Sequence, residues 1–88
     1  MDYRIEWTAP AVREFRKLDR GAARRVARAV TALGSEPRPA GARSLVGQPS
    51  GVMRIRVGDY RVVYRIEDDH VVVTVVRVAH RREVYRNL

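Results

Sequence analysis

Residues 53–66 read MRIRVGDYRVVYRI, two runs of alternating side chains on either side of a Gly-Asp pair. Apolar residues alternate with arginines before the pair and largely again after it, at the period of two that is typical of half-buried strands. A glycine at the first central position suits a two-residue type II′ turn. The stretch therefore predicts a β-hairpin that turns at Gly58-Asp59 and has one apolar face and one arginine face.

The two-residue turn also predicts the register of the hairpin. Val57 is then paired with Tyr60 and Arg56 with Arg61, while Arg54 lies on the same face as the two other arginines. Like charges opposite each other destabilise a sheet, and a phosphate would relieve the repulsion because guanidinium groups fit its oxygens. The face is either a phosphate or nucleic-acid site or a solvated strand face in an arginine-rich chain, and the hairpin alone does not decide between them.

Length and composition narrow the class of protein. A chain of 88 residues holds one modest core, so we expect a single domain over residues 1–88. The net charge of +8 indicates an acidic partner, which by charge alone could be a nucleic acid, an anionic membrane or an acidic protein. The absence of cysteine leaves the compartment open. There is, however, no apolar signal segment and no apolar run long enough to span a bilayer. We therefore expect a cytoplasmic protein without a membrane partner.

Periodicity upstream of the hairpin predicts one strand and two helices. Apolar residues alternate over residues 3–7, which indicates a short strand. Apolar spacings of three and four then predict helices over residues 9–18 and 20–33. Thr8 and Asp19 stand where N-caps are expected. Two short helices with a tight joint indicate a helical hairpin packed on a sheet.

The remaining segments complete the predicted fold. Residues 34–51 are expected to form an irregular loop, which begins where Gly34 ends the second helix. Leu45 and Val46 are expected to hold the middle of this loop to the core. After the hairpin and an acidic turn, residues 71–79 are apolar at nearly every position, which predicts a central strand covered on both faces. The predicted class is α+β, in the order β-α-α-β-β-β, with a mainly antiparallel sheet on the helical hairpin.

The residues favour phosphate chemistry over other kinds of site. No His, Asp or Glu spacing suggests a metal site, so we expect no bound metal, and neither a nucleophile elbow nor a glycine-rich phosphate loop occurs. Arginine can stabilise charge on a phosphate but is too basic to accept a proton. A general base would have to be His80 or Tyr85, although a tyrosine in this place could equally anchor the chain's end. The candidate residues are Arg54, Arg56, Arg61, His80, Arg81 and Tyr85.

Five segments together resemble the RelE branch of the RelE/ParE toxin superfamily: YRIEW (3–7), FRKL (15–18), LVG (45–47), RIRVGDYRVVY (54–64) and VAHRREVY (78–85). The resemblance implies a RelE-like fold and the toxin of a type II toxin–antitoxin pair. Such toxins enter the ribosomal A site and cut mRNA by attack of a ribose 2′-hydroxyl on the adjacent phosphate, without metal or cofactor. It also implies a RelB-like acidic antitoxin that blocks the basic face, and operator DNA bound through the antitoxin complex.

The resemblance also implies a role for each candidate residue. By motif position, Arg61 steadies the phosphate, Arg81 either assists the leaving oxygen or shares in charge stabilisation, and Tyr85 falls on the tyrosine proposed as the general base. Arg54 and Arg56 stand where the best-known members have lysines, which keeps the charge but changes the geometry. The residues assigned to RNA or phosphate contacts are Arg54, Arg56 and His80.

Two other functions fit parts of the sequence. A ParE-like inhibitor of DNA gyrase would share the fold but lack the set of arginines and tyrosine. A non-catalytic module that binds nucleic acid or only an antitoxin would keep the charge without the cleavage. Retention of the whole set argues against the gyrase inhibitor, and the ribosome-dependent endoribonuclease is the leading hypothesis.

Overall fold

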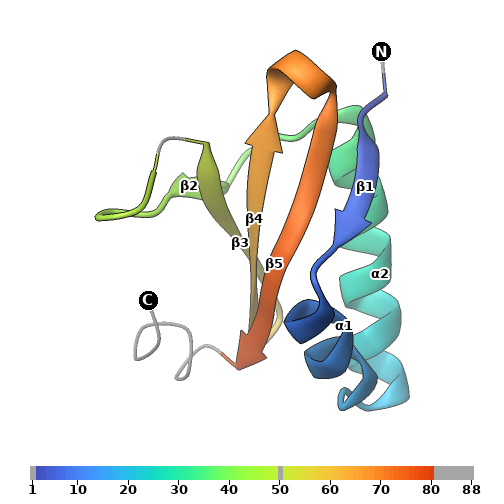
Figure 1. Ribbon diagram of the computed structural model, residues 1–88. Helices are drawn as coiled ribbons and strands as arrows, with labels where there is room; N and C mark the ends of the chain where they lie inside the picture. The colour runs from blue at the N-terminus through green and yellow to red at the C-terminus, as the bar shows by residue number, and fades with distance from the viewer. Residues whose placement is uncertain (1, 50, 81–88) are drawn as a thin grey trace.

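The computed structural model describes residues 2–49 and 51–80, which form one five-stranded sheet and two α-helices (Figure 1). The strand order is β1-β5-β4-β3-β2, in which β1 is parallel to β5 and all other neighbouring strands are antiparallel. The elements in chain order are β1 (Arg4–Trp7), α1 (Ala9–Arg16), α2 (Arg20–Ser35), β2 (Arg43–Ser44), β3 (Val52–Val57), β4 (Tyr60–Glu67), the 3-10 helix η1 (Asp68–His70) and β5 (Val72–His80). The predicted α+β class and the central place of the last strand are confirmed.

The hairpin of β3 and β4 has the predicted register. Arg56 pairs with Arg61, and the connection is the two-residue turn Gly58-Asp59. Gly58 has a φ of 59°, whereas Asp59 has no positive φ, which fits a type II′ turn and excludes a type I′ turn. The short-range pattern around the glycine was therefore sufficient to place every pair of the hairpin.

Both predicted N-caps are confirmed. The Thr8 hydroxyl accepts a hydrogen bond from the Ala11 N–H at 3.2 Å, and the Asp19 carboxylate accepts one from the Ala22 N–H at 2.7 Å. Each side chain satisfies an N–H group that has no partner within its own helix. The helices therefore begin where the sequence predicted.

The C-terminal ends of the two helices differ from the prediction. The Leu18 N–H donates to the Phe15 carbonyl, three residues back, so α1 tightens and ends two residues early. Gly34 does not end α2, which continues to Ser35. A Cβ atom on Gly34 would lie 3.2 Å from the Tyr3 carbonyl oxygen. The absence of a side chain on Gly34 therefore lets α2 pack closely against the backbone beside β1. This role differs from the predicted one of ending the helix.

The main core lies between the two helices and one face of the sheet. Apolar residues of α1 and α2 pack on alternate residues of β3 and β4 and on three valines of β5, whose alternation is interrupted by a register shift. The Trp7 and Phe15 rings meet edge to face at 5.2 Å. The buried members are Ala11, Val26, Val30, Leu33, Ile55, Val62, Tyr64, Ile66, Val73, Val75 and Val78. These apolar side chains, removed from water, supply most of the stabilisation of the fold.

A second, smaller apolar cluster covers part of the opposite face of the sheet. Its buried members are Val52, Val63 and Ala79, and Leu45 and Val76 pack against them. This cluster explains why β5 is apolar at nearly every position, because both of its faces are covered.

The loop after α2 contains the short strand β2, which was not predicted. β2 pairs with β3, and the Leu45 N–H donates to the Val52 carbonyl. Leu45 packs against the second cluster, as expected, but Val46 is 99% exposed, so the prediction that it anchors the loop is wrong. A two-residue strand carries too little alternation to be recognised in a sequence.

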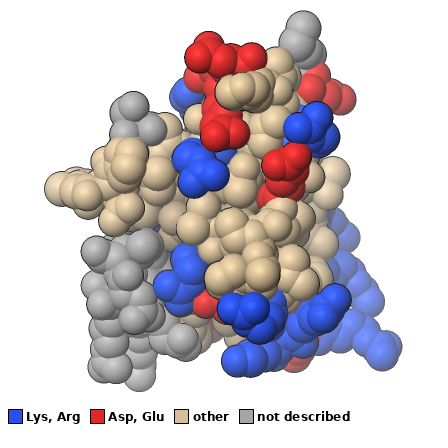
Figure 2. All heavy atoms as spheres, viewed as in Figure 1, with Lys and Arg blue, Asp and Glu red and all other residues tan. Residues whose placement is uncertain are grey.

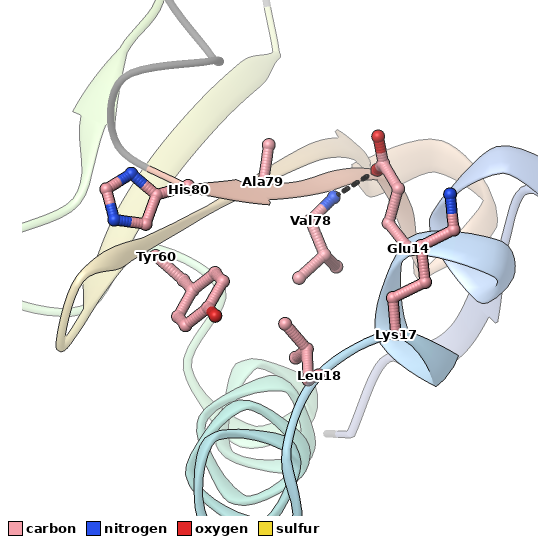
Figure 3. Close-up of a pocket in the computed structure, with 7 residues that line it drawn as sticks. All are labelled: Glu14, Lys17, Leu18, Tyr60, Val78, Ala79 and His80. Carbon is pink, nitrogen blue, oxygen red and sulfur yellow. Dashed lines mark hydrogen bonds between the residues drawn. The ribbon is translucent and has the colours of Figure 1, made fainter.

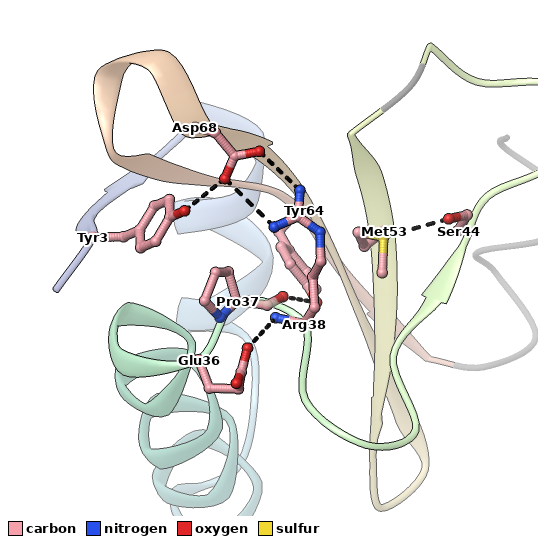
Figure 4. A network of polar contacts seen from close by, with 8 residues as sticks. All are labelled: Tyr3, Glu36, Pro37, Arg38, Ser44, Met53, Tyr64 and Asp68. Carbon is pink, nitrogen blue, oxygen red and sulfur yellow. Dashed lines mark hydrogen bonds and ion pairs between the residues drawn. The ribbon is translucent and has the colours of Figure 1, made fainter. Parts of the chain in front are cut away.

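A buried tyrosine holds the start of the same loop to the sheet. The Tyr64 hydroxyl donates to the Pro37 carbonyl at 2.7 Å (Figure 4), and the side chain is fully buried. Burial, as the largest cause, raises the pKa of Tyr64 to about 12. The neutral hydroxyl is therefore the form that the folded state stabilises.

The raised pKa predicts a change in relative stability at alkaline pH. Tyr64→Phe should lower the free energy of unfolding by about 1 kcal/mol near pH 7, because the hydrogen bond to Pro37 is lost. An unfolded tyrosine ionises at about pH 10. The contribution of Tyr64 to the free energy of unfolding is therefore complete below that pH and falls as the pH rises towards 12. Thermal unfolding of both proteins should show the wild type as the more stable below roughly pH 10 and the less stable above roughly pH 11. Parallel stability curves across this range would contradict the assignment.

Candidate functional site

Four arginines form two cross-strand pairs on the face of the sheet that is turned away from the helices. Arg43 of β2 pairs with Arg54 of β3, and Arg56 of β3 pairs with Arg61 of β4. Side chains of directly paired residues point to the same face with Cα atoms roughly 4.5–5.5 Å apart. We call these four residues the arginine face. Arg54, Arg56 and Arg61 were predicted from the sequence, whereas Arg43 was missed because its strand was not recognised.

The arginine face is less open than the sequence suggested. Arg61 is only 5% exposed, Arg54 is half-buried and Arg56 is exposed. Arg61 is flanked on its own strand by Val63 and paired with Ala79, two members of the second apolar cluster. A guanidinium keeps its charge when it is buried, and neighbouring side chains restrict its orientation. The expectation of a solvated open face is therefore corrected at Arg61.

Acidic and basic side chains gather at opposite ends of the sheet (Figure 2). Most acidic groups in this view lie at the end that carries η1, whereas most of the basic groups lie towards the end with the β3–β4 turn and the joint between the helices. The Asp68 carboxylate accepts hydrogen bonds from Arg38 at 2.9 Å and from Tyr3 at 2.6 Å (Figure 4). The hydrogen bond from Arg38, followed by that from Tyr3, lowers the pKa of Asp68. As predicted, the acidic turn is too far along the strands to compensate Arg56 and Arg61.

His80 is not gathered with the arginines. It pairs with Tyr60, and the two rings meet nearly at right angles, with centroids 5.8 Å apart and an interplanar angle of 78°. Because Ala79 is the residue that pairs with Arg61, His80 lies on the other face of the sheet, on the side of the helices. The register therefore separates His80 from the arginine face, and its predicted contact with phosphate stays a prediction.

His80 instead borders a cleft of about 330 Å³ between the end of β5 and the end of α1 (Figure 3). The sequence analysis did not identify this cleft. The alternation of Tyr60 with Arg61 on the predicted hairpin could have indicated it, because this alternation places the tyrosine on the other face of the sheet from the arginines. Its lining residues are Glu14, Lys17, Leu18, Tyr60, Val78, Ala79 and His80.

A carboxylate from α1 fixes the strand end beside this cleft. The Glu14 carboxylate accepts a hydrogen bond from the Val78 N–H at 2.7 Å. It also forms an ion pair with Arg77, in which Nη2 and Nε lie 2.7 and 2.8 Å from the carboxylate oxygen. β1 ends at Trp7, opposite Val75, so none of the described strands lies beside the last residues of β5 on that side. Glu14 supplies the acceptor that a neighbouring strand would otherwise provide.

Two predicted catalytic residues, Arg81 and Tyr85, lie outside the described residues. Within residues 2–49 and 51–80, no group of three or more His, Asp or Glu side chains is placed to hold a metal ion. No helix in the same part of the chain is long and apolar enough to cross a membrane.

Comparison with known proteins gives consistent matches over nearly the whole chain. The family model described as the ParE toxin of type II toxin–antitoxin systems matches residues 5–85. Toxin RelG of Mycobacterium tuberculosis is 38% identical over 87 residues, which covers 98% of this chain and 99% of RelG.

Solved structures share the fold closely. A chain of the toxin–antitoxin complex RelBE2 from Mycobacterium tuberculosis superimposes with a TM-score of 0.79 at 32% identity, covering 91% of this chain and 99% of that one. A mutant of the E. coli toxin RelE in the free state gives a TM-score of 0.80 at 29% identity, with coverages of 98% and 93%.

Proposed function

Because the chain belongs to the RelE/ParE superfamily of type II toxin–antitoxin toxins, we propose that it is a RelE-like, ribosome-dependent endoribonuclease that cuts mRNA in the A site. The observation that carries the proposal is the pairing of arginines across neighbouring strands, Arg43 with Arg54 and Arg56 with Arg61. Each pair places like charges opposite each other, which is locally unfavourable and attracts an anion to this face. A phosphodiester backbone is such an anion, and guanidinium groups match its oxygens.

The arrangement suits cleavage by the RNA's own 2′-hydroxyl. In that step the 2′-oxygen bonds to the adjacent phosphorus as its proton passes to a base. The bond from phosphorus to the 5′-oxygen of the next nucleotide breaks, and that oxygen takes up a proton. The products are a 2′,3′-cyclic phosphate and a 5′-hydroxyl. Fixed positive charge at the phosphate stabilises the negative charge that develops in the transition state.

We assign these roles to particular residues of the chain. Arg61 is buried and restricted, which suits a group that holds the phosphate in one orientation. Arg54 and Arg56 are more exposed and suit contacts with the RNA backbone on either side. Arg81 would assist the leaving oxygen. Tyr85 would be the general base, since His80 lies on the opposite face of the sheet.

The charge and the relatives support a proposal for the partners. One solved relative is part of a toxin–antitoxin complex, and we propose that this chain likewise binds an acidic, RelB-like antitoxin. A net charge of +8 would speed that association and make it dependent on salt. The complex would bind operator DNA through the antitoxin. The toxin itself would act in the cytoplasm, on ribosomes that carry mRNA.

A ParE-like gyrase inhibitor is the second candidate, because the matching family model carries the ParE name. Purified protein can be added in parallel to a reconstituted translation reaction and to a DNA gyrase supercoiling reaction. An mRNA endoribonuclease should stop translation and leave supercoiling unchanged. Inhibition of supercoiling with translation intact would instead assign the chain to the gyrase inhibitors. Activity in neither reaction would support a module that only binds.

A further inference from the structure

The cleft between the end of β5 and the end of α1 has the chemistry of a nucleotide site. Its two rings, Tyr60 and His80, stand almost perpendicular and form a corner (Figure 3). A flat base stacked on one ring would meet the other ring with its edge. Leu18 and Val78 supply an apolar floor, and Lys17 supplies a positive charge at the rim. Stacking on aromatic side chains, with polar groups at the base edge, is how proteins bind unpaired RNA bases.

The charge and size of the cleft agree with this occupant. The one carboxylate of the lining, that of Glu14, accepts hydrogen bonds from Arg77 and from the Val78 N–H. Its negative charge is therefore largely compensated, and it does not oppose a phosphate near Lys17. A volume of about 330 Å³ is at the lower limit of ligand pockets and suits one nucleotide.

The cleft is also placed within reach of the arginine face. Tyr60 directly precedes Arg61 on β4, so their Cα atoms are about 3.8 Å apart while their side chains point to opposite faces. The two faces meet at the β3–β4 turn, where Gly58 and Asp59 form a compact edge. An RNA strand that passes over this edge could place a phosphate at Arg61 and a neighbouring base in the cleft.

We propose that this cleft binds the base of a single unpaired nucleotide that flanks the scissile phosphate, and that Tyr60 is its stacking platform. The inference rests on the proposed function, because the nucleotide belongs to the RNA that is cut. It adds a base-recognition site on the face of the sheet opposite the arginines.

Direct occupancy can be tested without any cleavage. Isotope-labelled protein is titrated with ribonucleoside 5′-monophosphates, and amide shifts are followed by NMR. We expect shifts at Lys17, Leu18, Tyr60 and Ala79. Inorganic phosphate and a polyglutamate peptide serve as separate probes. The proposal would be overturned if the nucleotides cause no shifts at the cleft or if phosphate alone causes equal shifts. It would also be overturned if the peptide, and not the nucleotide, saturates the cleft.

Two substitutions of the same residue separate stacking from folding. Tyr60→Phe keeps the ring and should bind nucleotides within about twofold of the wild type, whereas Tyr60→Leu should weaken binding about tenfold or more. Thermal unfolding establishes that both variants are folded, and Lys17→Ala provides a second variant at an exposed position. Lys17→Ala should weaken nucleotide binding measurably and leave the unfolding temperature unchanged. Equal nucleotide affinity in the wild type, Tyr60→Leu and Lys17→Ala would overturn the proposal.

A cleavage map distinguishes failure of this inference from failure of the proposed function. Wild type and Tyr60→Leu are compared on one mRNA in a translation reaction. We expect both to cut, with the base preference beside the cleavage site weakened in Tyr60→Leu. An unchanged preference would overturn the inference alone. If the wild type does not cut at all, the proposed function fails, whereas the NMR result still decides whether the cleft binds nucleotides.

Discussion

Arg61→Ala should lower the rate of mRNA cleavage on ribosomes by about a hundredfold or more, because it removes a fixed positive charge from the scissile phosphate. Arg61 is 5% exposed, and it is paired with Arg56 across the hairpin. Its guanidinium is therefore placed before the RNA arrives, which is the condition for large electrostatic stabilisation of a transition state. The measurement is the rate of cleavage of one mRNA in a purified translation reaction, with growth arrest on expression as a second readout.

Arg65→Ala is a matched control for this substitution. Arg65 lies on the same face of the same strand, but at the other end, and it is exposed. The control should cut mRNA at close to the wild-type rate. Arg61→Lys should fall between the wild type and Arg61→Ala, because lysine keeps the charge but not the planar fork. If Arg61→Ala is folded and cuts as fast as the wild type, the assigned role is wrong.

Glu14→Ala should lower the free energy of unfolding by about 2–3 kcal/mol and the unfolding temperature by about 10 °C or more. The carboxylate forms the ion pair with Arg77 and accepts the Val78 N–H, and both charged side chains are less than a quarter exposed. Alanine leaves a partly buried guanidinium and a strand N–H without this acceptor, and such losses exceed the net value of an average hydrogen bond.

Glu6→Ala is the control for Glu14→Ala, because Glu6 also pairs with an arginine. The Arg4–Glu6 pair is exposed on β1, with 69% and 51% of the two side chains accessible. Exposed pairs contribute little, so the unfolding temperature of Glu6→Ala should stay within a few degrees of the wild type. Similar losses in the two variants, measured by thermal unfolding at neutral pH, would contradict the role given to Glu14.

The sequence predicted the features that depend on neighbouring residues. The glycine of the turn and the alternation on each side placed every pair of the β3–β4 hairpin, including Arg56 with Arg61. The caps Thr8 and Asp19 placed the starts of both helices, since a cap needs only a side chain and the next turn of backbone. The central position of β5 followed from its apolar composition.

The features that depend on distant residues could not be predicted. Arg43 joined the arginine face because β2 pairs with β3 across the loop, and two residues carry no periodic signal. Glu14 and Arg77 are separated by sixty-three positions, and their contact exists only because β1 ends before β5 does. The burial of Arg61 likewise depends on the second apolar cluster, whose members come from four separate segments.

Mapping mRNA ends by primer extension tests the central claim most directly. Purified wild-type protein is added to a defined translation reaction, and the same mRNA is also incubated with the protein in the absence of ribosomes. Cuts confined to A-site codons, present only with ribosomes and lost in Arg61→Ala and Arg81→Ala, are the predicted result. Intact mRNA in the presence of folded protein and active ribosomes would contradict the proposal that the arginine face is the site of a ribosome-dependent endoribonuclease.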